Sequence, residues 1–220
     1  MLTALVLAGV VAAAPQPALA PGTYIYHATY GGQSVGTSTI VVKTDGATTE
    51  LDERVTGDFQ GTAASGTATL MLASDLSPSR YDVSGNVGGL PTRTSTEIAD
   101  GTATVKDGKR QTDVPLATGS QHFVIVDLGT FVGFMPLAAQ MKAWNDVQVT
   151  AVIPSFGQSL AIAPSANVAQ ARPSDVPAGD QSISFAGEEP FTIWYDPATF
   201  VPDEIVTSQG ITVTRDATAH

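Results

Sequence analysis

The sequence predicts a mainly β protein of antiparallel strands with one short, kinked helical segment packed inside. Short runs with alternating or β-branched residues recur between Gly, Pro and Asp-Gly turns, as in antiparallel sheets. The only longer apolar stretch outside the N-terminus is Gln121 to Trp144, where the spacing changes to three and four residues. No low-complexity linker divides the 220 residues, so we expect one folded domain. A sandwich, a barrel and an open barrel all fit this pattern.

The N-terminal residues 1–20 are predicted to be a secretory signal peptide. An apolar run is followed by two prolines and the small-residue box Ala18-Leu19-Ala20. Cleavage after Ala20 would leave residues 21–220 as the mature domain. The chain contains no Cys, which together with export is consistent with a bacterial periplasmic or secreted protein of this size.

The first half of the mature chain reads as successive hairpins. In Gly22 to Tyr30, three tyrosines and an alanine alternate with Ile25, His27 and Thr29, and Gly31-Gly32 forms the turn. The further strands expected in this half are Val35–Lys43, Thr48–Val55, Gly61–Leu72, Ser79–Val83, Thr92–Ile98, Thr102–Lys106 and Arg110–Leu116.

The central stretch divides into two parts. His122 to Val126 suits a short strand buried on both faces. From Asp127, a predicted N-cap, the apolar spacing is helical. Gly129, Gly133 and Pro136 disfavour a straight helix, so we expect two short turns with a kink. Asp127, Pro136 and Gln140 also interrupt the apolar run too early for a membrane span. The segment either fills the core or lines a pocket.

The last third returns to strands. Pro164 to Asp180 is rich in proline and is expected to be a loop with one short strand near Asn167–Ala171. The strands expected here are Asp146–Ile153, Gln158–Ile162, Ser182–Phe185, Phe191–Tyr195, Glu204–Thr207 and Ile211–Thr214, for a total of about fourteen.

The charge balance excludes some partners. The chain has 10 Lys and Arg residues against 21 Asp and Glu residues, a formal net charge of −11. Nucleic acids are bound by basic surfaces, so we expect no nucleic-acid partner. Attachment to anionic lipid surfaces is disfavoured for the same reason.

Sequence motifs for catalysis, metals and cofactors are weak. Residues 32–36 match G-x-S-x-G around Ser34, but the nucleophile elbow requires a following helix, whereas a strand pattern follows here. His27, His122 and His220 share no metal-ligand spacing. We therefore predict a protein that is not an enzyme, with no catalytic residues, no bound metal and no cofactor.

Large aromatic side chains are the remaining candidates for a binding site. Tyrosine and tryptophan combine an apolar body with a polar tip, which suits a lipid pocket and a β core equally. The predicted ligand-binding residues are Tyr24, Tyr26, Tyr30, Phe131, Phe134, Trp144 and Trp194.

Three segments carry a resemblance to a known architecture. They are the hairpin Tyr26–Gly36, the central VDLGTFVGFMPLAAQM, and the closing FTIWYDPATFVPDEIV with GITVTR. Together they resemble exported bacterial proteins of unknown function with the open β-barrel of the LolA and LolB lipoprotein carriers and of VioE. The resemblance implies a strongly curved antiparallel half-barrel with helical structure in its concave face. It leads us to expect a lipid or other apolar ligand there. The alternative is a structural or protein-interaction component of the envelope with a filled core.

Overall fold

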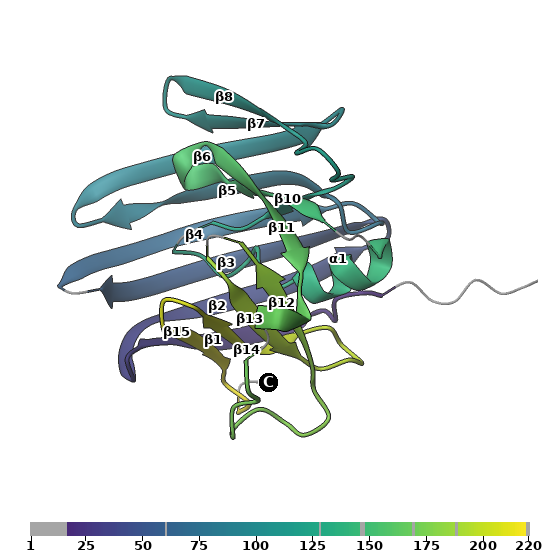
Figure 1. Ribbon diagram of the computed structural model, residues 1–220. Helices are drawn as coiled ribbons and strands as arrows, with labels where there is room; N and C mark the ends of the chain where they lie inside the picture. Colours follow the sequence, from purple (N-terminus) through teal and green to yellow (C-terminus); the bar gives the residue numbers. More distant parts are fainter. Residues whose placement is uncertain are drawn as a thin grey trace, which may run out of the picture.

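One large sheet accounts for most of the fold. In the computed structural model, the described residues (17–59, 61–127, 129–145, 148–168, 170–187 and 189–218) form a 15-stranded sheet. The strand order is β8-β7-β6-β5-β4-β3-β2-β1-β15-β14-β13-β12-β11-β10-β9, with no pairing between the two end strands. The prediction of a mainly β, open and curved antiparallel sheet with one α-helix is therefore confirmed (Figure 1).

The first half of the chain forms eight strands in sequential hairpins. These are β1 (Gly22–Tyr30), β2 (Gln33–Asp45), β3 (Thr48–Phe59), β4 (Thr62–Leu72), β5 (Pro78–Val87), β6 (Leu90–Ala99), β7 (Thr102–Asp107) and β8 (Arg110–Pro115). The predicted hairpin at Ser34 is confirmed, because residues 33–45 form β2 and pair directly with β1.

The second half forms shorter strands and the helix. These are β9 (Phe123–Ile125), α1 (Leu137–Trp144), β10 (Val149–Ile153), the 3-10 turn η1 (Pro154–Phe156), β11 (Gln158–Pro164), the 3-10 turn η2 (Ala166–Val168), β12 (Gln181–Ala186), β13 (Phe191–Tyr195), β14 (Pro202–Thr207) and β15 (Ile211–Arg215). No helix in the described part of the chain has the length and apolar character needed to cross a membrane.

One strand pairing and one set of packing contacts determine how the two halves of the chain meet. β1 pairs with β15 in antiparallel register, with Tyr26 opposite Arg215, which joins the two halves into one sheet. At the far end β9 pairs in parallel with β10. This end lies back over the long strands, since β9 contacts β5 and η1 contacts β6 (Figure 1).

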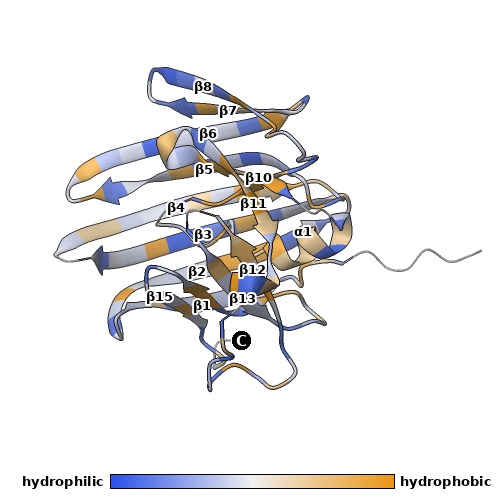
Figure 2. Cartoon of the chain, in the orientation of Figure 1, coloured by the Kyte–Doolittle hydropathy of each residue, from blue (hydrophilic) through white to orange (hydrophobic). Residues whose placement is uncertain are grey.

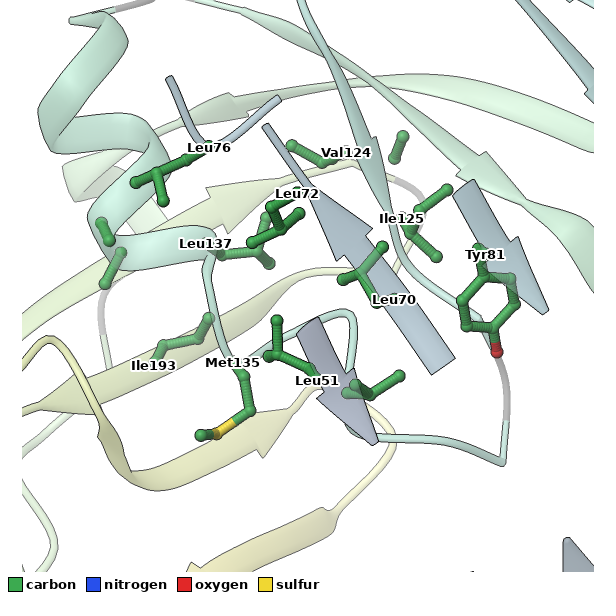
Figure 3. Close-up of a cluster of buried hydrophobic side chains, with 14 of the residues drawn as sticks. Leu51, Leu70, Leu72, Leu76, Tyr81, Val124, Ile125, Met135, Leu137 and Ile193 are labelled. Carbon is green, nitrogen blue, oxygen red and sulfur yellow. The ribbon is translucent and has the colours of Figure 1, made fainter. Parts of the chain in front are cut away.

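The core lies between the long strands and this returning layer. Alternate residues of the long strands face inward, such as Leu51 on β3 and Leu70 on β4, which are fully buried. Figure 3 shows them beside Ile125, Met135 and Leu137 of the central stretch. Hydrophobic residues gather around α1 and β10–β13 (Figure 2).

Three sequence predictions about local structure need correction or lie outside the described residues. Asp127 is not a helix N-cap: α1 begins ten residues later at Leu137, and Pro136 occupies the N-cap position without a side-chain hydrogen bond. The predicted strand Asn167–Ala171 is wrong for its described residues, because η2 occupies Ala166–Val168. Asp146 and Val147, predicted to begin β10, lie outside the described residues.

Candidate functional site

The concave face of the sheet is occupied by the protein's own chain. We call residues 122–127 and 129–144 the inner segment. Its Val132, Met135 and Leu137 have 0–1% of their surface exposed. The Tyr26 hydroxyl lies 3.0 Å from the Met135 sulfur and donates a 2.9 Å hydrogen bond to the Pro202 carbonyl. The inner segment thus packs against β1, and the same Tyr26 hydroxyl also binds the first residue of β14.

A buried carboxylate attaches the inner segment to β3. Glu53, 2% exposed, accepts backbone hydrogen bonds from Phe131 at 3.0 Å and Val132 at 3.1 Å, and one from the Ser38 hydroxyl at 2.5 Å. Burial raises the pKa of Glu53, and the Asp127 carboxylate raises it further, while these hydrogen bonds act in the opposite direction.

A second carboxylate attaches the inner segment to β5 and to η1. Asp127 accepts a hydrogen bond from the Tyr81 hydroxyl at 3.0 Å and one from the backbone N–H of Ser155 at 3.1 Å. The Tyr81 hydroxyl is also 3.1 Å from that of Thr130. Burial and the Asp127 charge raise the pKa of Tyr81. Both carboxylates are enclosed and hydrogen-bonded, an arrangement suited to holding the segment in place.

The tyrosines predicted to bind ligand have three different environments. Tyr26 is 1% exposed and belongs to the core. Tyr24 is half-buried and donates a 2.9 Å hydrogen bond to the Ala20 carbonyl. Tyr30 is 40% exposed, beside the β1–β2 turn.

The other predicted ligand-binding residues are also separated. Phe131 and Phe134 are half-buried against the core, and Phe134 packs edge-to-face on Phe191 at 5.3 Å. Trp144 stacks on His122 at 4.3 Å and donates to the Asp75 carbonyl at 2.7 Å. Trp194 lies below the Arg172 guanidinium, 4.9 Å from its ring centre. The seven side chains therefore do not form one wall.

The histidines are dispersed. The ring of His27 lies 3.6 Å from the carboxylate of Asp216, whereas His122 stacks on Trp144. His220 lies outside the described residues. Within the described part of the chain, no three His, Asp or Glu side chains are grouped as metal ligands.

Sequence reasoning missed an acidic cluster beneath the loop that precedes β12. Asp180 and Asp203 are each 8% exposed, and Asp203 forms an ion pair with Arg215. Burial, followed by the hydrogen bond and the charge of Asp203, raises the pKa of Asp180 to about 7. The Arg172 guanidinium donates to the carbonyls of Pro177 and Asp180, which holds the loop closed. The sequence spacing of these residues gives no signal of their proximity.

Glu204 is a third buried acid in this region. It is 3% exposed, and burial, with the charge of Asp175, raises its pKa to about 7. Its carboxylate lies 3.5 Å from the Thr214 hydroxyl. Two acidic groups near this loop therefore change protonation near neutral pH.

Two shallow grooves lie on the outer face of β3–β6. Their volumes are about 410 and 610 Å³, and they share Thr67, Ser84 and Arg93. These side chains alternate along the strands with buried residues such as Ala68, so they point away from the core. The polar side chains on the outer face of the larger groove are Arg54, Thr56, Ser65, Thr67, Ser84, Asn86 and Arg93.

Comparisons with known proteins leave the function open. A scan against protein-family models matches no family, and a search of curated proteins finds no match. Among solved structures, the fold is similar to that of a DUF1089 family protein from Pseudomonas aeruginosa, with 11% sequence identity and a TM-score of 0.48. The match covers 91% of this chain and 95% of that chain. The resemblance to the open barrel of the lipoprotein carriers stays a prediction.

Proposed function

We propose that this protein is an exported, non-catalytic component of the bacterial envelope that docks another protein. The observation that supports this proposal is the filled concave face. Glu53 on β3 and Tyr81 on β5 are hydrogen-bonded to the inner segment, and apolar side chains pack between these attachments. A partner protein must therefore bind on the outer surface or at the ends of the sheet.

One end of the sheet carries exposed apolar side chains suited to a protein partner. The β1–β2 and β5–β6 turns lie at the same end (Figure 1). Beside these turns, Tyr30, Val87 and Leu90 are 40%, 48% and 72% exposed. Val87 and Leu90 lie directly opposite each other across the β5–β6 turn and form one exposed apolar pair, whereas Tyr30 lies four strands away on β1. Adjacent exposed apolar side chains of this kind are typical of protein contact sites.

Site-specific photo-crosslinking in intact cells tests the docking role. A photoreactive residue at Leu90 is expected to give a discrete protein adduct. The same residue at Ala47, which is exposed at the opposite end of the sheet, serves as the control. No adduct from Leu90, or the same adducts from both positions, would contradict the proposal.

A lipid carrier is the second candidate, and the half-buried Phe131 and Phe134 favour it. A ligand there would displace part of the inner segment, whose backbone is attached through Glu53. Native mass spectrometry of protein from its own envelope distinguishes the two candidates. A bare mass, retained after incubation with palmitate, supports the filled core. A stoichiometric lipid adduct supports the carrier.

A further inference from the structure

The larger outer groove is unusual in this acidic protein because it presents positive charge. Two arginines line it, and none of its lining residues is Asp or Glu. The whole chain has only 10 Lys and Arg residues and a net charge of −11. The groove therefore carries positive charge, whereas the protein as a whole is strongly negative.

The two arginines are also available to a ligand. Within the described residues neither Arg54 nor Arg93 forms an ion pair, although several other cations on this sheet do. The acidic side chains at positions 52 and 82 already form ion pairs with other cations. Asp52 is 2.6 Å from Lys43, and Asp82 is 2.5 Å from Arg80.

The strand register places neutral hydrogen-bonding groups between the arginines. Arg54 is opposite Thr67, Thr67 is opposite Ser84, and Ser84 is opposite Arg93. Three strand spacings separate the two arginine backbones, a distance of about 14 Å. The hydroxyls of Thr67 and Ser84 lie 3.3 Å apart in the middle of this row. The result is a polar strip with a guanidinium at each end.

The floor of the groove is backbone. Gly66 and Gly85 are directly opposite each other. A Cβ built on Gly85 would lie 2.4 Å from the Ser65 carbonyl oxygen, and one on Gly66 would lie 2.9 Å from that of Ser84. Larger residues at this pair would push β4 and β5 apart. Both glycines line the groove through their backbone, between the side-chain rows that form its walls on the outer face.

We propose that this groove binds an acidic oligosaccharide, with Arg54 and Arg93 each pairing with one carboxylate along the chain. Guanidinium groups bind carboxylates through paired, charge-assisted hydrogen bonds, and the hydroxyls and the Asn86 amide suit sugar hydroxyls. The groove is open, so it fits an extended chain better than an enclosed small molecule. Nucleic acids and anionic membranes present dense rows of phosphates that need many cations, whereas this groove has two, so a chain with widely spaced carboxylates fits it better. This inference is independent of the proposed protein docking.

Titration calorimetry with the full mature protein tests the site. The probe is a hexamer of galacturonic acid, and the comparison ligands are a neutral glucose hexamer and inorganic phosphate. We expect the acidic hexamer to bind and the neutral one not to bind. The R54Q/R93Q double variant should bind the acidic hexamer at least tenfold more weakly. Both arginines are exposed, so the variant should keep its thermal midpoint.

A matched control separates local recognition from overall charge. The K109Q/R110Q variant also removes two positive charges, at the exposed β7–β8 turn away from the groove, and should keep wild-type affinity. Equal binding by R54Q/R93Q, equal weakening by K109Q/R110Q, equal binding of the neutral hexamer, or binding of phosphate alone would each overturn the proposal.

Discussion

Individual buried carboxylates decide how the inner segment is held. Replacing Glu53 by Leu would remove the acceptor for the N–H groups of Phe131 and Val132 and for the Ser38 hydroxyl. Each buried donor left without a partner costs about 1–3 kcal/mol. We therefore expect Glu53→Leu to lower the free energy of unfolding by at least about 2 kcal/mol, as measured by urea denaturation.

The control for this prediction lies on the same strand. Glu50 points outward and pairs with Lys43 at 3.0 Å. Because an exposed ion pair contributes little, Glu50→Leu should cost less than about 1 kcal/mol. Similar losses for the two variants would show that the Glu53 hydrogen bonds do not hold the segment.

Two other acids make stability depend on pH. Asp180 and Glu204 have folded-state pKa values of about 7, above the value of about 4 that carboxyls have in an unfolded chain. Between these values the folded protein binds more protons than the unfolded chain. The free energy of unfolding therefore falls as pH rises from about 4 through about 7, and the contribution of these groups is lost above that range.

The D180N/E204Q variant tests this effect by thermal melts at several pH values. An amide at position 180 can donate to Asp203 without needing a proton. We expect the variant to lose much of the decrease in unfolding midpoint seen for wild type between about pH 5 and 8. Asp107→Asn, at an exposed carboxyl on β7, should keep the wild-type profile. An unchanged profile in D180N/E204Q would contradict the assignment.

At the scale of elements, close backbone contacts within the inner segment restrict side-chain size. A Cβ on Gly133 would lie 2.3 Å from the Ile125 carbonyl oxygen. That atom belongs to the backbone of the segment's β9 strand, which pairs with β10 and cannot move independently. We expect Gly133→Ala to lower the free energy of unfolding by about 1–3 kcal/mol in urea denaturation.

Gly179 provides the matched comparison. A Cβ added there meets no atom within 4 Å, and its backbone conformation is open to any residue. Gly179→Ala should therefore be neutral or slightly stabilising, because alanine restricts the unfolded chain. If both substitutions have the same effect, the Gly133 contact is not a packing constraint.

Most elements could be predicted from the sequence, and the errors have physical causes. The alternation of Tyr24, Tyr26, Ala28 and Tyr30 predicts β1 because strand residues face two sides. The helix was expected to begin at Asp127. Instead, residues before Leu137 form turns, and the Asp127 carboxylate bonds to Tyr81 and Ser155 far along the chain. Such long-range partners leave no mark on local periodicity.

At the scale of the whole molecule, the sheet's path could not be predicted from its strands. The sequence pattern fits a sandwich and an open sheet equally, because both bury alternate residues. The distinction depends on β1 pairing with β15 and on β9 lying against β5. For the same reason, Asp180, Asp203 and Arg215 meet only in the folded chain. The sequence also does not predict that Arg54 and Arg93 line one groove. They lie in one row only because of the register of the four strands β3 to β6.

The packing of the N-terminal residues leads to a prediction about the mature chain. Leu19 is 3% exposed and belongs to the core, Ala20 donates a 3.2 Å backbone hydrogen bond to Thr199, and the Ala20 carbonyl accepts from Tyr24. Cleavage after Ala20 would remove these contacts.

A chain beginning at Pro21 should be about 2–5 kcal/mol less stable than one beginning at Leu19, as for other losses of a buried leucine. A chain beginning at Ala18, which is exposed, should match the Leu19 chain within about 0.5 kcal/mol. Urea denaturation of the three purified chains measures both differences. Equal stability of all three would show that Leu19 does not contribute to the core, whereas the expected loss favours a mature N-terminus that retains it.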